Sequence, residues 1–207
     1  MAPDRTSGTE GYAEEAPALI KQYESVAFAD VHRHVLHLIP TTPGRVLEVG
    51  AGTGRDAAGL AAMGHRVTAI EPTAELRLAA RQLHPSPLIE WRDDSLPDLT
   101  TLTTTRESFD VVMLTAVWMH LDEAQRRRAM PGVARLIRPG GVMILSLRHG
   151  PVPPGRRMFD VSGNETTALA QAEGLTLELQ LDTQGSMSGR PGVTWTRLAF
   201  SKPRQPL

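Results

Sequence analysis

Residues 46–72, VLEVGAGTGRDAAGLAAMGHRVTAIEP, set three glycines between two short apolar runs. The first run, 45–49, suits a buried parallel strand, and the glycines at 50, 52 and 54 follow it directly. Glycine at a strand end permits positive φ and lets a ligand approach the backbone without meeting a Cβ. The helix expected over 55–63 would point its free N–H groups at that ligand. The stretch therefore predicts a small-molecule site.

Strands and helices alternate along the remaining chain. Further strands are expected over 66–71, 88–91, 109–117, 142–148, 175–181 and 193–200, and further helices over 74–83 and 163–173. This order predicts an α/β fold, a doubly wound, mostly parallel seven-stranded sheet with an antiparallel C-terminal hairpin. In such sheets the ligand lies outside the carboxyl ends of the strands, where the strand order reverses.

Three helical regions carry signals of their own. One helix is expected from Pro17 to Leu38, stopped by Pro40, and it defines an N-terminal segment, 1–40, ahead of the main domain, 41–207. Pro131, followed by glycine, predicts a break in the helix after the fourth strand. Thr73 is expected to cap the helix over 74–83.

Composition excludes several classes of protein. The 207 residues suit one domain, and a formal net charge of −1 gives no overall field that attracts nucleic acid or an acidic membrane. Without cysteine there is no disulfide, thiolate nucleophile or cysteine-based zinc site. His34 and His37 share a helical face, but no nearby carboxylate completes a metal site, so none is expected. No apolar run reaches membrane-span length and no signal-peptide core is visible, so a cytoplasmic monomer or homodimer is expected.

The spacing of the loop separates two classes of cofactor. A dinucleotide fingerprint, G-x-G-x-x-G, would need glycine where Arg55 stands. The run reads E-V-G-A-G-T-G instead, beginning at Glu48, and Glu71 ends the next strand, where a carboxylate can accept both hydroxyls of a ribose. Glu71 alone would fit NAD as well. The combination resembles the class I S-adenosylmethionine-dependent methyltransferases, and WRDDSLPDL (91–99), FDVVMLTAVWMHL (109–121) and LIRPGGVMILSL (136–147) are similar to later segments of that family.

The resemblance implies S-adenosylmethionine as cofactor, S-adenosylhomocysteine as product, and a set of binding residues. Gly50, Ala51, Gly52 and Gly54 would line the methionyl part, Glu48 would lie near its amino group, and Glu71 would bind the ribose. Pro72, Ser95 and Thr115 are further expected cofactor contacts. The adenine acid is Asp93 or Asp94, because this segment is one or two residues shorter than in common members. Arg55 either meets the cofactor carboxylate or is solvated.

The acceptor side rests on individual residues. Transfer from a sulfonium is an in-line displacement that in principle needs no metal, but a hydroxyl or ammonium acceptor must lose a proton, for which histidine is suited. His120 and His149 follow the fourth and fifth strands and are the catalytic candidates, with a backbone-bonded loop histidine as the alternative for each. Arg148 and Arg156 would suit a carboxylate or phosphate on the acceptor, against a solvated loop.

Three aromatic residues complete the expected acceptor site. Trp118 would wall the pocket, while Tyr12 and Tyr23 belong to an N-terminal segment that closes over the cofactor in many members of the family. Core packing fits Tyr23 equally well.

The acceptor itself is expected to be a small molecule. TAVW stands where base- and amide-methylating members carry N-P-P-[FYW], and the chain has no basic surface for nucleic acid. Methylation of a protein or peptide, and a cofactor-binding module without catalysis, stay open as alternatives.

Overall fold

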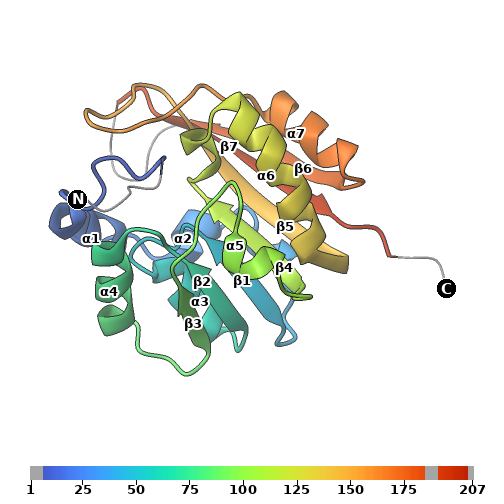
Figure 1. The fold of residues 1–207 in the computed structure, drawn as a ribbon, viewed down its shortest axis with the longest axis horizontal. Helices are drawn as coiled ribbons and strands as arrows, with labels where there is room; N and C mark the ends of the chain where they lie inside the picture. The colour runs from blue at the N-terminus through green and yellow to red at the C-terminus, as the bar shows by residue number, and fades with distance from the viewer. Residues whose placement is uncertain (1–6, 185–190, 205–207) are drawn as a thin grey trace.

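A seven-stranded sheet organises the chain, in the order β3-β2-β1-β4-β5-β7-β6 (Figure 1). The computed structural model describes residues 7–184 and 191–204. The strands are β1 (Arg45–Val49), β2 (Arg66–Ile70), β3 (Ile89–Arg92), β4 (Phe109–Thr115), β5 (Ile137–His149), β6 (Thr176–Gln184) and β7 (Thr194–Ser201). Strands β1 to β5 pair in parallel, whereas β7 pairs antiparallel to both β5 and β6. The predicted fold class is confirmed; within the hairpin connection, residues 185–190 lie outside the described residues.

Helices cover both faces of this sheet. They are α1 (Ala16–Glu24), α2 (Phe28–His32), α3 (Arg55–Ala62), α4 (Ala74–Leu83), α5 (Thr100–Thr103), α6 (Glu123–Leu136) and α7 (Gly163–Ala172), with 3-10 turns η1 (Leu36–Leu38) and η2 (Trp118–His120). Helix α3 and η1 contribute to one apolar core, while α5, α6 and α7 contribute to the other. In Figure 1, α6 and α7 lie side by side along one face.

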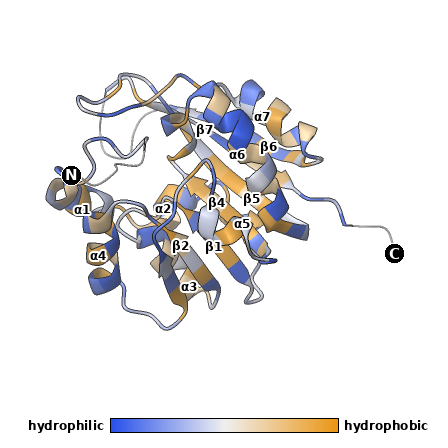
Figure 2. Ribbon diagram, viewed as in Figure 1, coloured by the Kyte–Doolittle hydropathy of each residue, from blue (hydrophilic) through white to orange (hydrophobic). Residues whose placement is uncertain are grey.

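Both faces of the central strands are apolar because both are covered. In β4, Val111 and Met113 pack in one core while Val112 and Leu114 pack in the other, as the two-residue period of a strand requires. Figure 2 shows these strands as hydrophobic, with hydrophilic residues on the outer surface of α6. The continuous apolar runs in the sequence are therefore the interior of the sheet.

The single helix predicted over 17–38 is wrong. The chain forms α1, α2 and η1 instead, with extended backbone at Ala27 (φ −67°, ψ 147°) between the first two. The bend lets α1 lie beside α4 while α2 packs on α3, where the Phe28 ring occupies the space that a Cβ at Gly59 would fill. One straight helix could not make both contacts.

The predicted break at Pro131 is also wrong. Helix α6 runs unbroken through this proline for 14 residues and begins with a capping box between Asp122 and Gln125. Pro131 removes the hydrogen bond to the carbonyl of Arg127, but both residues are exposed, so water can satisfy that carbonyl. At α4, Thr73 occupies the N-cap position as predicted, but its side chain makes no capping bond.

Candidate functional site

A cavity of about 530 Å³ lies at the carboxyl ends of the parallel strands. It is bounded by the loops after β1, β2, β3 and β4, by the N-terminal segment, and by β5, β6 and β7. Strand order reverses between β1 and β4, so this is the place where a doubly wound sheet binds its ligand. The predicted site residues that line the cavity are Tyr12, Tyr23, Glu48, Gly50, Ala51, Gly52, Arg55, Glu71, Pro72, Asp94, Ser95, Thr115, His120, Arg148 and Arg156.

The three glycines of the loop, at positions 50, 52 and 54, have different structural roles. Gly50 (φ +72°) carries the chain past the β4 loop, since a Cβ there would lie 2.4 Å from Cγ2 of Val117. Gly54 (φ +85°) is a packing glycine: a Cβ would lie 2.6 Å from the Trp91 ring, and the residue does not line the cavity. Gly52 turns its N–H toward Glu71, and a Cβ there would meet only the Tyr23 ring, at 4.0 Å.

Glu71 fixes the shape of the loop. Its buried carboxylate accepts hydrogen bonds from the backbone N–H of Gly52 (2.8 Å) and of Thr73 (2.7 Å). Burial raises the pKa of this carboxyl, although the two N–H groups act in the opposite direction. Each carboxylate oxygen has a second lone pair, so Glu71 can still accept bonds from a ligand diol.

A buried charge cluster lies beneath the loop. Asp56 is held between His32 (Nε2–Oδ2 2.8 Å) and Arg55 (Nε–Oδ1 2.7 Å), and these two partners outweigh burial and hold its pKa well below the usual range. Burial, followed by the negative charge of Asp56, raises the pKa of Glu48 well above its ordinary value. Among the described residues, Glu48 Oε2 has no hydrogen-bond partner although it is buried. A ligand ammonium group would supply that partner, so the site fits the amino acid end of S-adenosylmethionine.

The guanidinium of Arg55 bonds to other protein groups. Besides Asp56, its guanidinium donates to the backbone carbonyl of Tyr23 (3.2 Å) and so ties α1 to the loop. Glu24 adds a second tie, accepting from Thr53 (2.5 Å) and pairing with His84 (3.1 Å).

Asp93 and Asp94 have different environments. Asp94 is buried on the cavity wall, and its oxygens accept from the backbone N–H groups of Thr100 (3.0 Å) and Thr101 (2.7 Å) at the start of α5. The Asp93 side chain is 66% exposed, pairs with Arg77 (2.8 Å), and does not line the cavity.

His120 is the centre of the acceptor side. Its Nδ1 lies 2.7 Å from the backbone carbonyl of Arg157, which can only accept, so Nδ1 carries the hydrogen. Its Nε2 therefore accepts from the Tyr12 hydroxyl at 3.0 Å. Burial, with further contributions from Arg156 and Arg148, lowers the pKa of His120, while burial raises that of Tyr12. The pair is accordingly a neutral imidazole and a protonated phenol.

Two arginines join the 150–159 segment to the rest of this side. Arg157 donates to the carbonyl of His120 (3.0 Å) and pairs with Asp122 (2.8 Å). The guanidinium of Arg156 lies 4.1 Å from the centre of the Tyr12 ring and pairs with Glu15 (2.9 Å). Arg156 thus holds the N-terminal segment over the cavity, a contact the sequence did not predict.

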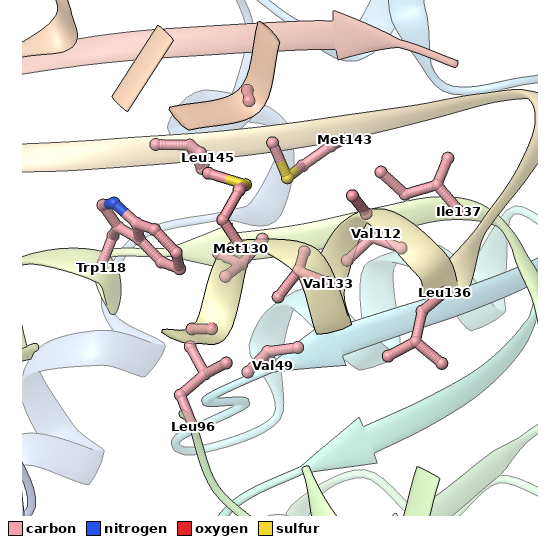
Figure 3. Packing of buried hydrophobic residues seen from close by; sticks show 14 of the residues in the cluster. Val49, Leu96, Val112, Trp118, Met130, Val133, Leu136, Ile137, Met143 and Leu145 are labelled. Carbon is pink, nitrogen blue, oxygen red and sulfur yellow. The ribbon is translucent and has the colours of Figure 1, made fainter. Parts of the chain in front are cut away.

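Two predicted acceptor-side residues lie elsewhere. His149 points away from the cavity and its Nε2 lies 2.8 Å from the hydroxyl of Thr196, because β5 includes His149 and alternates it with Arg148. Trp118 is fully buried in the core beside Met130 and Leu145 (Figure 3). Neither residue lines the cavity.

Sequence reasoning missed part of the cavity wall. Arg33, Ser146, Thr183 and Arg197 line it, and only the folded sheet brings them together. Arg197 had a visible signal, as the one charged residue in the run VTWTRLAF.

Within residues 7–184 and 191–204, no group of three or more histidine, cysteine, aspartate or glutamate side chains could hold a metal ion. No helix there has both the length and the apolar character to span a bilayer.

Comparison with known proteins agrees with this geometry. Residues 47–145 match the family described as "Methyltransferase domain". An uncharacterized methyltransferase of Mycobacterium tuberculosis is 34% identical over 111 residues, which cover 50% of this chain and 40% of that protein. Glycine N-methyltransferase of Rattus norvegicus is 26% identical over 188 residues, covering 75% of this chain and 63% of the relative. The chain thus spans between 40% and 63% of the length of these curated relatives.

Solved structures share the fold. The Burkholderia thailandensis 1,6-didemethyltoxoflavin-N1-methyltransferase, solved with 1,6-didemethyltoxoflavin and S-adenosylhomocysteine, matches with a TM-score of 0.65 at 20% identity, covering 98% of this chain and 93% of that one. A Methanosarcina mazei S-adenosylmethionine-dependent methyltransferase matches with a TM-score of 0.67 at 17% identity, covering 82% and 96% of the two chains.

Proposed function

We propose that this chain transfers a methyl group from S-adenosylmethionine to a small-molecule acceptor, because residues 47–145 match the methyltransferase domain family and the fold is shared with S-adenosylmethionine-dependent methyltransferases. The observation that carries the proposal is that two buried carboxylates, Glu48 and Glu71, line the cavity beside the glycine loop. Glu71 is held by the N–H of Gly52, and Glu48 also lines the cavity, with one oxygen that has no hydrogen-bond partner among the described residues. A diol and an ammonium group are the complements of these two sites.

The cofactor would be held along the strand ends. Glu71 would accept the ribose hydroxyls, Glu48 would meet the ammonium group, and Asp94, rather than the exposed Asp93, would lie toward the adenine. When bound, S-adenosylmethionine supplies a methyl group on a sulfonium, a leaving group that requires no metal activation.

His120 would take the proton that the acceptor loses. Its Nδ1–H is fixed by the Arg157 carbonyl, so Nε2 is the basic atom, and Tyr12 stands at that atom. The lowered pKa keeps the imidazole neutral near pH 7 and therefore able to accept a proton. Tyr12 would pass the proton on to Nε2 or yield its place to the acceptor. The N-terminal segment, which we assign to residues 1–40 as a lid on domain 41–207, would exclude water.

Several points support a small acceptor. Glycine N-methyltransferase and 1,6-didemethyltoxoflavin-N1-methyltransferase are named for small-molecule acceptors. The N-terminal segment is fastened across the cavity by Arg156 and Glu15, which leaves a bounded space of a size suited to small ligands. We extend the proposal to a cytoplasmic monomer or homodimer that binds no nucleic acid, in keeping with the near-neutral charge.

Calorimetry tests the cofactor assignment. S-adenosylhomocysteine should bind the wild-type protein, and Glu71→Ala should weaken binding by roughly 1–3 kcal/mol, the cost of lost charge-assisted bonds. Tight NAD binding without S-adenosylhomocysteine binding would contradict the assignment.

Mass spectrometry tests the reaction. Incubation with S-adenosylmethionine and a pool of metabolites should yield S-adenosylhomocysteine and a product heavier by one methyl group, and EDTA should leave the yield unchanged. Methylation of added protein alone would indicate a protein or peptide acceptor, and binding without turnover would indicate a non-catalytic module.

A further inference from the structure

The arginines that line the cavity differ in whether a carboxylate forms an ion pair with them. Arg55 is paired with Asp56, and Arg156 with Glu15. Away from the cavity, the buried Arg126 is paired with Glu165. Arg33 and Arg197 also line the cavity, but within residues 7–184 and 191–204 no carboxylate lies within ion-pair distance of either. Two cations therefore line the same cavity with no ion-pair partner in the part of the chain that the structure describes.

Arg197 is positioned by the sheet. It lies on β7 directly opposite Ser146 of β5, which also lines the cavity. Its guanidinium donates to the hydroxyl of Thr183 on β6 (2.6 Å) and to the carbonyl of Val31 (3.5 Å). These neutral partners orient the group, and a guanidinium has five N–H donors, so donors remain for a ligand.

Arg33 follows α2 and brings a second positive charge toward Arg197. Burial, and then the charge of Arg33, lowers the pKa of Arg197. Like charges held near one another oppose folding, and an anion bound between the partly buried Arg197 and the exposed Arg33 would reduce that cost. The acidic groups nearby are already engaged: Glu15 pairs with Arg156, and Asp182 accepts from Thr196 on the opposite face.

We propose that Arg33 and Arg197 form a subsite for an anionic oxygen group, a carboxylate or a phosphate, on the methyl acceptor. This inference rests on the proposed function and names the class of acceptor. Arg148 also lies on the cavity wall, since it shares the cavity-facing side of β5 with Ser146. The acceptor would extend from the arginines to the reacting group beside His120.

The backbone that carries Arg197 lies apart from the strand that would place the amino acid end of the cofactor. Strands β4 and β5 separate β7 from β1, which carries the glycine loop. At about 4.8 Å per strand, the backbone of Arg197 is roughly 14 Å across the sheet from β1. The amino acid end of the cofactor, placed by Glu48 at the end of β1, lies on the far side of that distance.

Titration with simple anions tests the subsite. The protein is saturated with S-adenosylhomocysteine at low ionic strength, which avoids screening, and benzoate, inorganic phosphate and neutral benzamide are added in turn. At least one anion should bind measurably better than benzamide, and whether it is benzoate or phosphate distinguishes the two chemistries. Arg197→Gln and Arg33→Gln should each lower the affinity for that anion by about tenfold or more, as expected for lost charge-assisted bonds.

Matched variants make the result decisive. Arg127→Gln removes an exposed arginine of α6, and it should bind the anion as the wild type does. Arg33 is exposed, so its replacement tests the subsite without disturbing core packing. Wild-type affinity in both Arg33→Gln and Arg197→Gln, or benzamide binding as tightly as the anions, would overturn the inference.

The same measurement separates this inference from the proposed function. If S-adenosylhomocysteine fails to bind the wild-type protein, the proposed function fails, and the anion titration is then read on the cofactor-free protein. If S-adenosylhomocysteine binds but neither anion does, only the subsite is wrong.

Discussion

The two halves of the cavity are built in different ways. The half that fits the cofactor comes mainly from one continuous stretch, 48–73, and backbone N–H groups hold its key carboxylate, Glu71. The acceptor half joins side chains from distant parts of the chain, such as Tyr12, His120 and Arg197. A site held by local backbone can be recognised from a short sequence, whereas a site assembled from side chains depends on the whole sheet.

The acceptor half is held together by cross-links that involve the 150–159 segment. Arg156 ties the 150–159 segment to the N-terminal segment through Glu15, and Arg157 ties it to the start of α6 through Asp122. The His120 ring makes one hydrogen bond to the Tyr12 hydroxyl in the N-terminal segment and one to the Arg157 carbonyl in the 150–159 segment. Its orientation is therefore a property of the assembled fold.

The largest expected effect comes from breaking this assembly at its centre. His120→Ala should lower kcat/KM by about 10²–10⁴, the range for loss of a general base, while affinity for S-adenosylhomocysteine stays nearly unchanged. Because its pKa lies below the ordinary 6.5, wild-type kcat/KM should fall only on the acid side of that value as His120 gains a proton. That acid limb should be absent from the variant's pH profile.

His149→Ala is the matched control. The side chain bonds to Thr196 on the face away from the cavity, so its loss should cost about 1 kcal/mol of stability and leave kcat/KM unaltered. A kinetic loss in His149→Ala equal to that in His120→Ala would show that the acceptor binds on the other face of β5.

The smaller, second effect concerns charge in the cofactor half. The folded-state pKa of Glu48 is raised above its ordinary 4.5, so its contribution to stability is full below that value and is lost as pH rises through the folded-state pKa. Glu48→Gln cannot ionise and should therefore melt at a higher temperature than wild type at pH 8, without cofactor, by roughly 2–4 °C for each kcal/mol. The difference should shrink toward pH 4.

The same variant should bind S-adenosylhomocysteine about tenfold more weakly, since an amide replaces a carboxylate opposite the ammonium group. Stability and binding thus change in opposite directions. A variant that melts lower than wild type at pH 8, or binds the ligand equally well, would contradict the role of Glu48.

What the sequence could predict follows the same division. The glycine spacing, Glu48 and Glu71 are neighbours along the chain, and the structure brings them together on one wall of the cavity. His149 was misplaced for a physical reason: the fifth strand was expected to end at residue 148, but it includes His149, and successive residues of a strand face opposite ways. A boundary error of one residue moved a side chain across the sheet.

Other misses depended on packing that no local pattern encodes. Trp118 follows β4 as expected, but the η2 turn directs its indole into the core against Met130 (Figure 3). Arg33 and Arg197 are separated by most of the chain, and their shared cavity wall exists only because β7 lies between β5 and β6 and the N-terminal segment crosses nearby.

The smallest expected effect lies at the edge of the cofactor half, where the sequence did not decide whether Asp93 or Asp94 contacts the adenine. Asp94 lines the cavity and accepts hydrogen bonds from the N–H groups of Thr100 and Thr101 at the start of α5. Asp94→Asn should therefore lower the free energy of unfolding by about 1 kcal/mol and the affinity for S-adenosylhomocysteine a few-fold. Asp93→Asn loses only a pair with Arg77 whose carboxylate is largely solvated, and both its stability and its affinity should match wild type. Thermal melting and calorimetry on the two variants separate these outcomes. If Asp93→Asn is the variant that loses affinity, the adenine lies outside the wall that Asp94 forms, and the boundary of the cofactor half must be moved toward the exposed end of β3.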